Sequence, residues 1–138
     1  MTETYTGGCT CGAVRYEAKG DPVAELHCQC RHCRSRSGTG HSSYVVFSGE
    51  SAVTFSGKPR TFSMTADSGA EKLHAFCPDC GAPTHVTFPA SPGLTAIHPG
   101  GLDAPERFHP AFVTYGSRGL AWDAMAGNVK VFEKLPTE

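Results

Sequence analysis

Long apolar runs are missing from this sequence. No segment of its 138 residues approaches the length of about 20 consecutive apolar residues that a membrane-spanning helix needs. The stretch from Met1 to Gly8 is polar and glycine-rich, and it lacks the basic residues followed by an apolar run that form a secretion signal. These absences predict a soluble, cytoplasmic protein without a membrane partner.

An excess of positive charge is missing as well. Twelve Lys and Arg residues stand against thirteen Asp and Glu residues, which gives a net charge of -1. Proteins that bind nucleic acid or anionic lipid usually present a positive field. The composition therefore argues against nucleic acid as a partner, and the basic cluster from Arg31 to Arg36 is the only feature in its favour.

Helical periodicity is the third absence, because no window of about a dozen residues repeats its apolar positions every 3.6 residues or so. Apolar residues alternate with polar ones instead, as in short β-strands. The alternating pairs are Val14/Tyr16, Tyr44/Val46, Val53/Phe55, Phe62/Met64, Leu73/Ala75 and Val86/Phe88. A short helical turn is expected only after Cys33.

Turn-forming residues are abundant, with sixteen glycines and ten prolines. They gather in clusters about ten residues apart, which is typical of antiparallel meanders. We therefore expect one mostly β, antiparallel domain over residues 1–138 with little helix. The chain after Gly93 is expected to form edge strands and loops, with a final strand near Lys130.

The cysteines, in contrast, are present in an informative pattern. The seven cysteines cannot all be paired within one chain, and cytoplasmic conditions disfavour structural disulfides. Metal ligation is the stronger explanation. The three groups are Cys9-Thr10-Cys11-Gly12, Cys28-Gln29-Cys30-Arg31-His32-Cys33 and Cys77-Pro78-Asp79-Cys80-Gly81.

The last group has the spacing of a zinc knuckle, in which a tight turn closed by glycine directs two thiolates at one ion. Two ligands do not complete a structural tetrahedral site, and the other glycine-closed pair, Cys9 and Cys11, is the natural complement. This pairing leaves the middle group with three thiols. Three protein ligands with an open fourth position form the pattern of a catalytic zinc.

Other arrangements of the cysteines remain open. Cys9 and Cys11 can be grouped with Cys28 and Cys30, which leaves Cys33 with the knuckle. The middle group can also be closed by a fourth ligand, with His27, His32 or His41 as the candidates. A thioredoxin-like dithiol at Cys30-x-x-Cys33 has no βαβ pattern around it.

The motifs resemble those of the glutathione-dependent formaldehyde-activating enzymes, a family that includes centromere protein V. The resemblance spans roughly residues 5 to 133. It is carried by Gly8-Cys9-Thr10-Cys11-Gly12-Ala13-Val14-Arg15-Tyr16, by Cys28-x-Cys30-x-x-Cys33-Arg34 with Ser37-Gly38, and by Phe76-Cys77-Pro78-Asp79-Cys80-Gly81. The segments Ile97 to Asp103 and Pro110 to Phe112 are similar to later parts of the family pattern.

The resemblance implies a β-tent fold with two zinc ions per chain. It places a structural zinc at Cys9, Cys11, Cys77 and Cys80, and a catalytic zinc at Cys28, Cys30 and Cys33. The implied activity is the reversible addition of the glutathione thiol to formaldehyde or a related aldehyde, which gives S-hydroxymethylglutathione. This is a carbon–sulfur lyase reaction.

Arg34 directly follows the last motif cysteine and is the candidate for binding glutathione, whose carboxylates suit a guanidinium. His41, His98 and His109 are candidates for moving a proton in the addition step, or are ordinary structural residues. Two non-catalytic functions stay open. One is a carrier of glutathione or another thiol, and the other is a zinc module that binds protein or nucleic acid.

Overall fold

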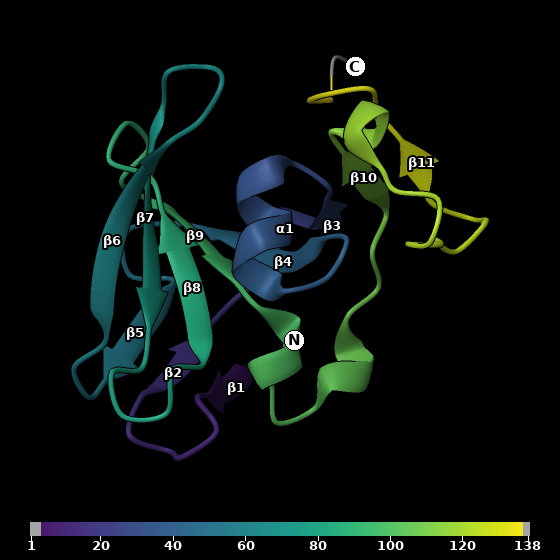
Figure 1. The fold of residues 1–138 in the computed structure, drawn as a ribbon. Helices are drawn as coiled ribbons and strands as arrows, with labels where there is room; N and C mark the ends of the chain where they lie inside the picture. The colour runs from purple at the N-terminus through teal and green to yellow at the C-terminus, as the bar shows by residue number, and fades with distance from the viewer. Residues whose placement is uncertain (1–3, 137–138) are drawn as a thin grey trace.

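The computed structural model describes residues 4–136, which form two β-sheets and one short α-helix (Figure 1). The small sheet has the strand order β1-β2-β5, and the large sheet has the order β11-β10-β3-β4-β9-β8-β7-β6. The elements are β1 (Tyr5–Gly8), β2 (Arg15–Ala18), β3 (Ala24–Cys28), α1 (Arg31–Ser37), β4 (Ser42–Ser48), β5 (Val53–Ser56), β6 (Arg60–Thr65), β7 (Glu71–Phe76), β8 (Pro83–Thr87), β9 (Leu94–Ile97), β10 (Phe112–Thr114) and β11 (Lys130–Val131), with short 3-10 turns at Pro99–Gly101, Pro105–Arg107 and Gly116–Arg118.

The prediction of a mostly β protein with little helix is confirmed. The alternating pairs mark β2 and β4 to β8, although Val14 and Phe88 fall just outside their strands. The expected final strand is β11. The pairs did not mark β1, β3, β9 and β10.

Two features of the large sheet differ from the expectation. It is not wholly antiparallel, because β10 runs parallel to both β3 and β11. The interpretation of the chain after Gly93 as edge strands and loops is wrong for β9, which lies between β4 and β8 inside the sheet. Both differences arise from pairings between strands that are distant in sequence, which local patterns do not encode.

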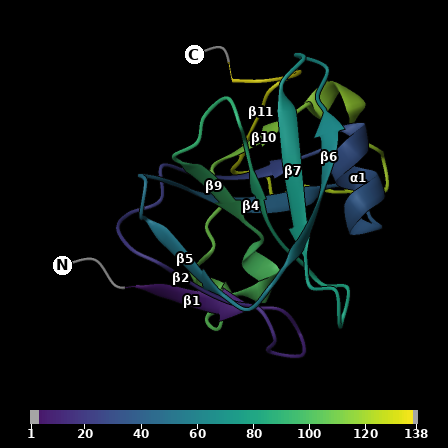
Figure 2. The same cartoon turned by 90° about the vertical axis from the view of Figure 1, so that its left-hand side faces the viewer.

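Alternation along the strands gives the large sheet two different faces. One face carries Val45, Phe47 and Ile97, which are almost fully buried against Tyr5 and Tyr16 of the small sheet. The other face is the concave side that curls around α1, as Figures 1 and 2 show. The cysteines of the middle group lie on this concave side.

Helix α1 begins and ends where local chemistry dictates. Cys30 is its N-cap, with a sulfur that accepts from the backbone N–H of Cys33 at 3.4 Å. Gly38 ends it with a left-handed φ of 76°, and its N–H donates to the carbonyl of Arg34. The helix starts before Cys33 rather than after it, and seven residues are too few for a visible helical period. Within residues 4–136, no helix has the length and apolar character to span a bilayer.

His74 on β7 is an unusual core residue. Its side chain has no exposed surface, and neither ring nitrogen has a hydrogen-bond partner among the described residues. The ring stacks on Phe62 with the centroids 5.3 Å apart. Burial above all, and then the positive charges of Arg36 and Lys72, lower the pKa of His74 to about 3. The folded state therefore holds this imidazole neutral.

We expect this histidine to make the fold sensitive to acid. A folded-state pKa below the unfolded value of 6.5 means that the unfolded chain takes up the proton first. The stabilisation is thus complete above pH 6.5 and declines as the pH falls toward 3, by up to about 1.4 kcal/mol per pH unit. Urea unfolding of the protein and of His74→Leu across this range measures the slope. An equal slope in both proteins would contradict the assignment.

Candidate functional site

Two loops that are distant in sequence bring four cysteines together. Cys9 and Cys11 follow β1, and Cys77 and Cys80 follow β7. Their sulfur atoms all lie within 4.8 Å of one another. Cys9 and Cys77 are buried, whereas Cys11 and Cys80 are exposed. We call this group the four-cysteine cluster.

Both loops are closed by a hydrogen bond from a glycine to the first cysteine of the pair. In the first, the N–H of Gly12 donates to the carbonyl of Cys9, and in the second, the N–H of Gly81 donates to the carbonyl of Cys77. Both glycines have left-handed φ values, 83° and 78°, which side chains with a Cβ rarely adopt. Each loop therefore turns back sharply enough to present both of its thiols on one side.

The four-cysteine cluster fits a tetrahedral, sulfur-preferring metal ion. Zinc–sulfur bonds of about 2.3 Å in a tetrahedron place neighbouring sulfur atoms about 3.8 Å apart. The sulfur of Cys11 lies 3.7 Å from those of both Cys9 and Cys77. Burial raises the pKa of Cys9, but hydrogen bonds from the Val14 N–H and neighbouring thiols outweigh it and bring the pKa to about 6. Several thiolates this close need a cation among them.

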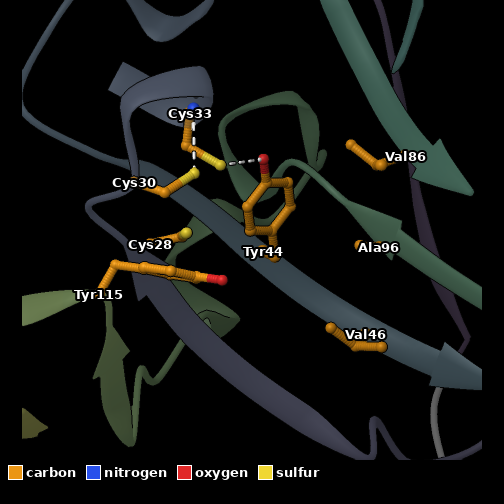
Figure 3. Packing of buried hydrophobic residues seen from close by; sticks show 8 residues of the cluster. All are labelled: Cys28, Cys30, Cys33, Tyr44, Val46, Val86, Ala96 and Tyr115. Carbon is orange, nitrogen blue, oxygen red and sulfur yellow. Dashed lines mark hydrogen bonds between the residues drawn. The ribbon is translucent and has the colours of Figure 1, made fainter. Parts of the chain in front are cut away.

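A second group, the three-cysteine cluster, consists of Cys28, Cys30 and Cys33, and all three side chains are buried. Cys28 ends β3, Cys30 caps α1 and Cys33 lies in the first turn of the helix. Their sulfur atoms lie within 4.8 Å of one another. Figure 3 shows the three side chains converging, with the ring of Tyr44 beside them.

Hydrogen bonds concentrate negative charge on the middle sulfur of this cluster. The thiols of Cys28 and Cys33, followed by the backbone N–H of Cys33, lower the pKa of Cys30 far below its ordinary value. The sulfur of Cys33 lies 3.1 Å from the hydroxyl oxygen of Tyr44. No histidine nitrogen, carboxylate or further thiol joins the cluster within the described residues. The donor set therefore fits a sulfur-preferring ion with three protein ligands.

The structure has a cavity of about 630 Å³ and a smaller one of about 400 Å³. The three-cysteine cluster lies in the wall of the first, which we call the larger cavity. Apolar side chains from the concave face form one part of the wall, among them Leu26, Val46 and Leu94. Charged side chains form another part. These are Arg31, Arg34, Asp67, Lys72 and Arg118.

The arginines of the basic cluster have different positions. Arg34 lines the cavity and donates from its guanidinium to the carbonyl of Arg118 at 3.4 Å. Arg31 is exposed and also lines the cavity. Arg36 instead donates to the carbonyl of Ala75 at 2.8 Å and stacks over Phe62, so it joins α1 to the sheet. Arg34 can therefore contact a ligand in the larger cavity, whereas Arg36 connects α1 to the sheet.

The candidate histidines lie away from the larger cavity. His41 contacts the carboxylate of Asp123 at 2.9 Å, and His109 is exposed. His98 packs against Tyr44 with the ring centroids 4.9 Å apart. None of the three lines the larger cavity, whereas His32 does. His41, His98 and His109 therefore have no direct access to a ligand at the three-cysteine cluster.

Sequence reasoning missed several residues of the cavity wall. Lys72 comes from β7, and Arg118 pairs with Asp67 across the cavity wall. No local signal could identify these charges, because chain segments far apart in sequence bring them together. Tyr115, another residue of the cavity wall, is distinguished by its backbone. Its φ is 56°, which is uncommon for a residue other than glycine. Such backbone strain often accompanies a functional site.

Comparison with known proteins agrees with this geometry. A family model described as "Glutathione-dependent formaldehyde-activating enzyme" matches residues 4–118. A crystal structure of a protein from Rhodobacter sphaeroides is similar, with a TM-score of 0.56 and 21% sequence identity over 71% of this chain and 87% of that chain. At this identity the likeness shows a shared fold alone. The match to the family model includes all seven cysteines, and the chain belongs to the glutathione-dependent formaldehyde-activating enzyme family.

Proposed function

We propose that the protein catalyses the reversible addition of the glutathione thiol to formaldehyde or a related aldehyde, as a carbon–sulfur lyase. The catalytic zinc would be held by Cys28, Cys30 and Cys33, and a structural zinc by the four-cysteine cluster. One observation carries the proposal. Three buried thiols, with no fourth protein ligand among residues 4–136, lie in the wall of a cavity large enough for a tripeptide.

The family match and the donor set support this assignment together. A zinc ion bound by three thiolates, when present, supplies a thiophilic centre that lowers the pKa of an incoming thiol. In the forward reaction the thiol loses its proton, its sulfur bonds to the carbonyl carbon, and the carbonyl oxygen gains a proton. The reverse reaction breaks the same carbon–sulfur bond.

Tyr44 is placed to keep the three-cysteine cluster in position. Its hydroxyl lies 3.1 Å from the sulfur of Cys33 and donates a hydrogen bond whenever that sulfur is ionised. Partners of this kind orient metal ligands and commonly affect metal affinity or activity by about 10- to 100-fold. Tyr44 thus acts through Cys33 as a positioning residue.

The charged part of the cavity wall suits the rest of glutathione. Glutathione carries two carboxylates and one ammonium group, and the wall offers four cations and one carboxylate. Arg34 lies next to the cluster in sequence, and a guanidinium binds a carboxylate through paired hydrogen bonds. We propose that Arg34 binds one glutathione carboxylate and so directs the thiol toward the cysteines.

Exchange spectroscopy tests the proposed function. With ¹³C-formaldehyde and glutathione, NMR is expected to show exchange between free and bound formaldehyde that rises in proportion to the concentration of zinc-loaded protein. Arg34→Ala is expected to raise the KM for glutathione by about tenfold or more, since a hydrogen bond to a charged group contributes about 1.5–3 kcal/mol.

The matched control for this experiment is Arg60→Ala. Arg60 is exposed on β6 and does not line the cavity, so its loss changes the net charge equally without removing a cavity group. Its KM for glutathione should stay within about twofold of the unmodified protein. Exchange no faster than in buffer alone would refute the proposed function, and equal KM values for the two variants would refute the role of Arg34.

A further inference from the structure

The larger cavity is much bigger than formaldehyde requires. Its volume is about 630 Å³, whereas each water-sized group occupies only about 30 Å³ in a liquid. Formaldehyde has one carbon and one oxygen, so it would fill a small fraction of this space. Glutathione accounts for more of the volume, but the nature of the wall limits where glutathione can lie.

The apolar part of the wall is a continuous strip across the concave face of the sheet. Val46 on β4 pairs with Ala96 on β9, and Ala96 pairs with Val86 on β8. The three side chains therefore stand in one row on the same face. Figure 3 shows them on the far side of the Tyr44 ring from the cysteines.

Larger apolar side chains extend this row toward solvent. Leu26, Phe88 and Leu94 line the same cavity, are half-buried, and pack against the core cluster that contains the row. We call these three residues and the row the apolar wall. The same cluster includes all three cysteines, so the apolar wall and the reacting centre are parts of one surface.

Glutathione is a poor occupant for the apolar wall. Burial of its carboxylates or ammonium group against Val46, Val86 and Ala96 would leave charges without partners, which is strongly unfavourable. Arg31 and Arg34 on α1 and Arg118 in the turn Gly116–Arg118 lie outside the apolar wall and suit those groups. What remains beside the apolar wall is the substituent on the carbon that bonds to the glutathione sulfur.

We propose that the preferred aldehyde carries an alkyl chain, which lies along the apolar wall while the carbonyl carbon reacts beside the three-cysteine cluster. This inference rests on the proposed function and specifies its substrate class. The bonds formed and broken are unchanged, because the chain replaces only one of the two hydrogens on the carbonyl carbon of formaldehyde. Formaldehyde is then a minimal substrate that leaves the apolar wall uncovered.

Binding of S-alkylglutathiones tests this without any turnover. S-methyl-, S-butyl- and S-hexylglutathione carry the same charges and differ only in the apolar chain on sulfur. Each added methylene is expected to tighten binding about fourfold when it is fully buried. Calorimetry with the zinc-loaded protein should therefore show a Kd for the hexyl compound at least about 100-fold below that for the methyl compound. Kd values within about threefold would overturn the proposal.

A pair of tryptophan substitutions locates the chain. Leu94→Trp narrows the cavity at a half-buried position of the apolar wall and should lower the ratio of kcat/KM for hexanal to that for formaldehyde by tenfold or so. Val23→Trp adds an indole at a position that is 60% exposed and outside the cavity, and should leave the ratio unchanged. Equal ratios in the two variants would contradict the proposed path. If Leu94→Trp fails to fold, Ala96→Leu replaces it, because a larger side chain at Ala96 also fills space beside the apolar wall.

The two proposals fail in distinguishable ways. If the protein exchanges formaldehyde but chain length affects neither binding nor kcat/KM, the proposed function holds and the proposal of an alkyl aldehyde is refuted. Chain-dependent binding without exchange of any aldehyde would remove the proposed function and leave the apolar wall as a site for S-alkylglutathiones.

Discussion

Replacement of Cys77 by serine is expected to unfold most of the protein at 25 °C. Cys77 is fully buried, and its sulfur lies 3.7 Å from that of Cys11 in the four-cysteine cluster. A structural zinc in small proteins contributes about 10–16 kcal/mol of apparent binding free energy, whereas whole domains are stable by only about 5–15 kcal/mol. Loss of one ligand should therefore remove most of the net stability. Circular dichroism and urea unfolding measure this.

Cys80→Ser separates loss of the metal from loss of packing. A serine hydroxyl at the buried Cys77 position also leaves a polar group without a good partner, which alone would destabilise the fold. Cys80 is exposed, so serine there disturbs no core packing. Both variants should lose one zinc per chain and both should lose stability. If Cys80→Ser were as stable as the unmodified protein, the four-cysteine cluster would not be a structural metal site.

Replacement of Cys33 by serine is expected to abolish catalysis while the fold persists. Serine is a weak zinc ligand compared with a thiolate, so the three-cysteine cluster would be left with two good ligands. The rate of formaldehyde exchange should fall to that of buffer with glutathione. Cys33 is also buried, so serine there should lower the stability, but the far-ultraviolet circular dichroism at 25 °C should still be that of the folded protein because the four-cysteine cluster is intact. Metal analysis should show the loss of one zinc per chain.

Tyr44→Phe is the matched control for Cys33→Ser. It removes the hydroxyl that contacts the sulfur of Cys33 at 3.1 Å but leaves all three thiols in place. Its exchange rate should fall by about tenfold, as for other partners of metal ligands, and both zinc ions should be retained. A full loss of exchange in Tyr44→Phe with zinc still bound would move the chemistry from the cysteines to the tyrosine hydroxyl.

Local features of this protein could be predicted from sequence because local geometry causes them. Alternation marked most of the strands, since a half-buried strand must bury every second side chain. The glycines after Cys11 and Cys80 signalled sharp turns, and both have the positive φ values that such turns require. Short spacing also predicted that Cys28, Cys30 and Cys33 lie close together, since a six-residue segment leaves their thiols little room to separate.

The cavity could not be predicted because its wall is built from distant segments. Its apolar row joins β4, β9 and β8, and the position of β9 inside the sheet carries no periodic signal. Its charges come from α1, the loop between β6 and β7, β7 itself and the turn Gly116–Arg118. In the sequence, Tyr44 and Val46 look like ordinary alternating core residues. Only the tertiary structure shows that they line the larger cavity.

The parallel pairing of β3 with β10 also has a consequence for how the chain folds. Leu26 pairs with Phe112, so this part of the sheet closes only after a long stretch of chain has been organised. Folding dominated by such non-local pairing takes milliseconds to seconds or so. Cys28, Cys30 and Cys33 are close together in sequence, so an unfolded chain can capture a metal ion there well before the loop after β7 reaches the loop after β1. During refolding, zinc should therefore reach the three-cysteine cluster first and the four-cysteine cluster last.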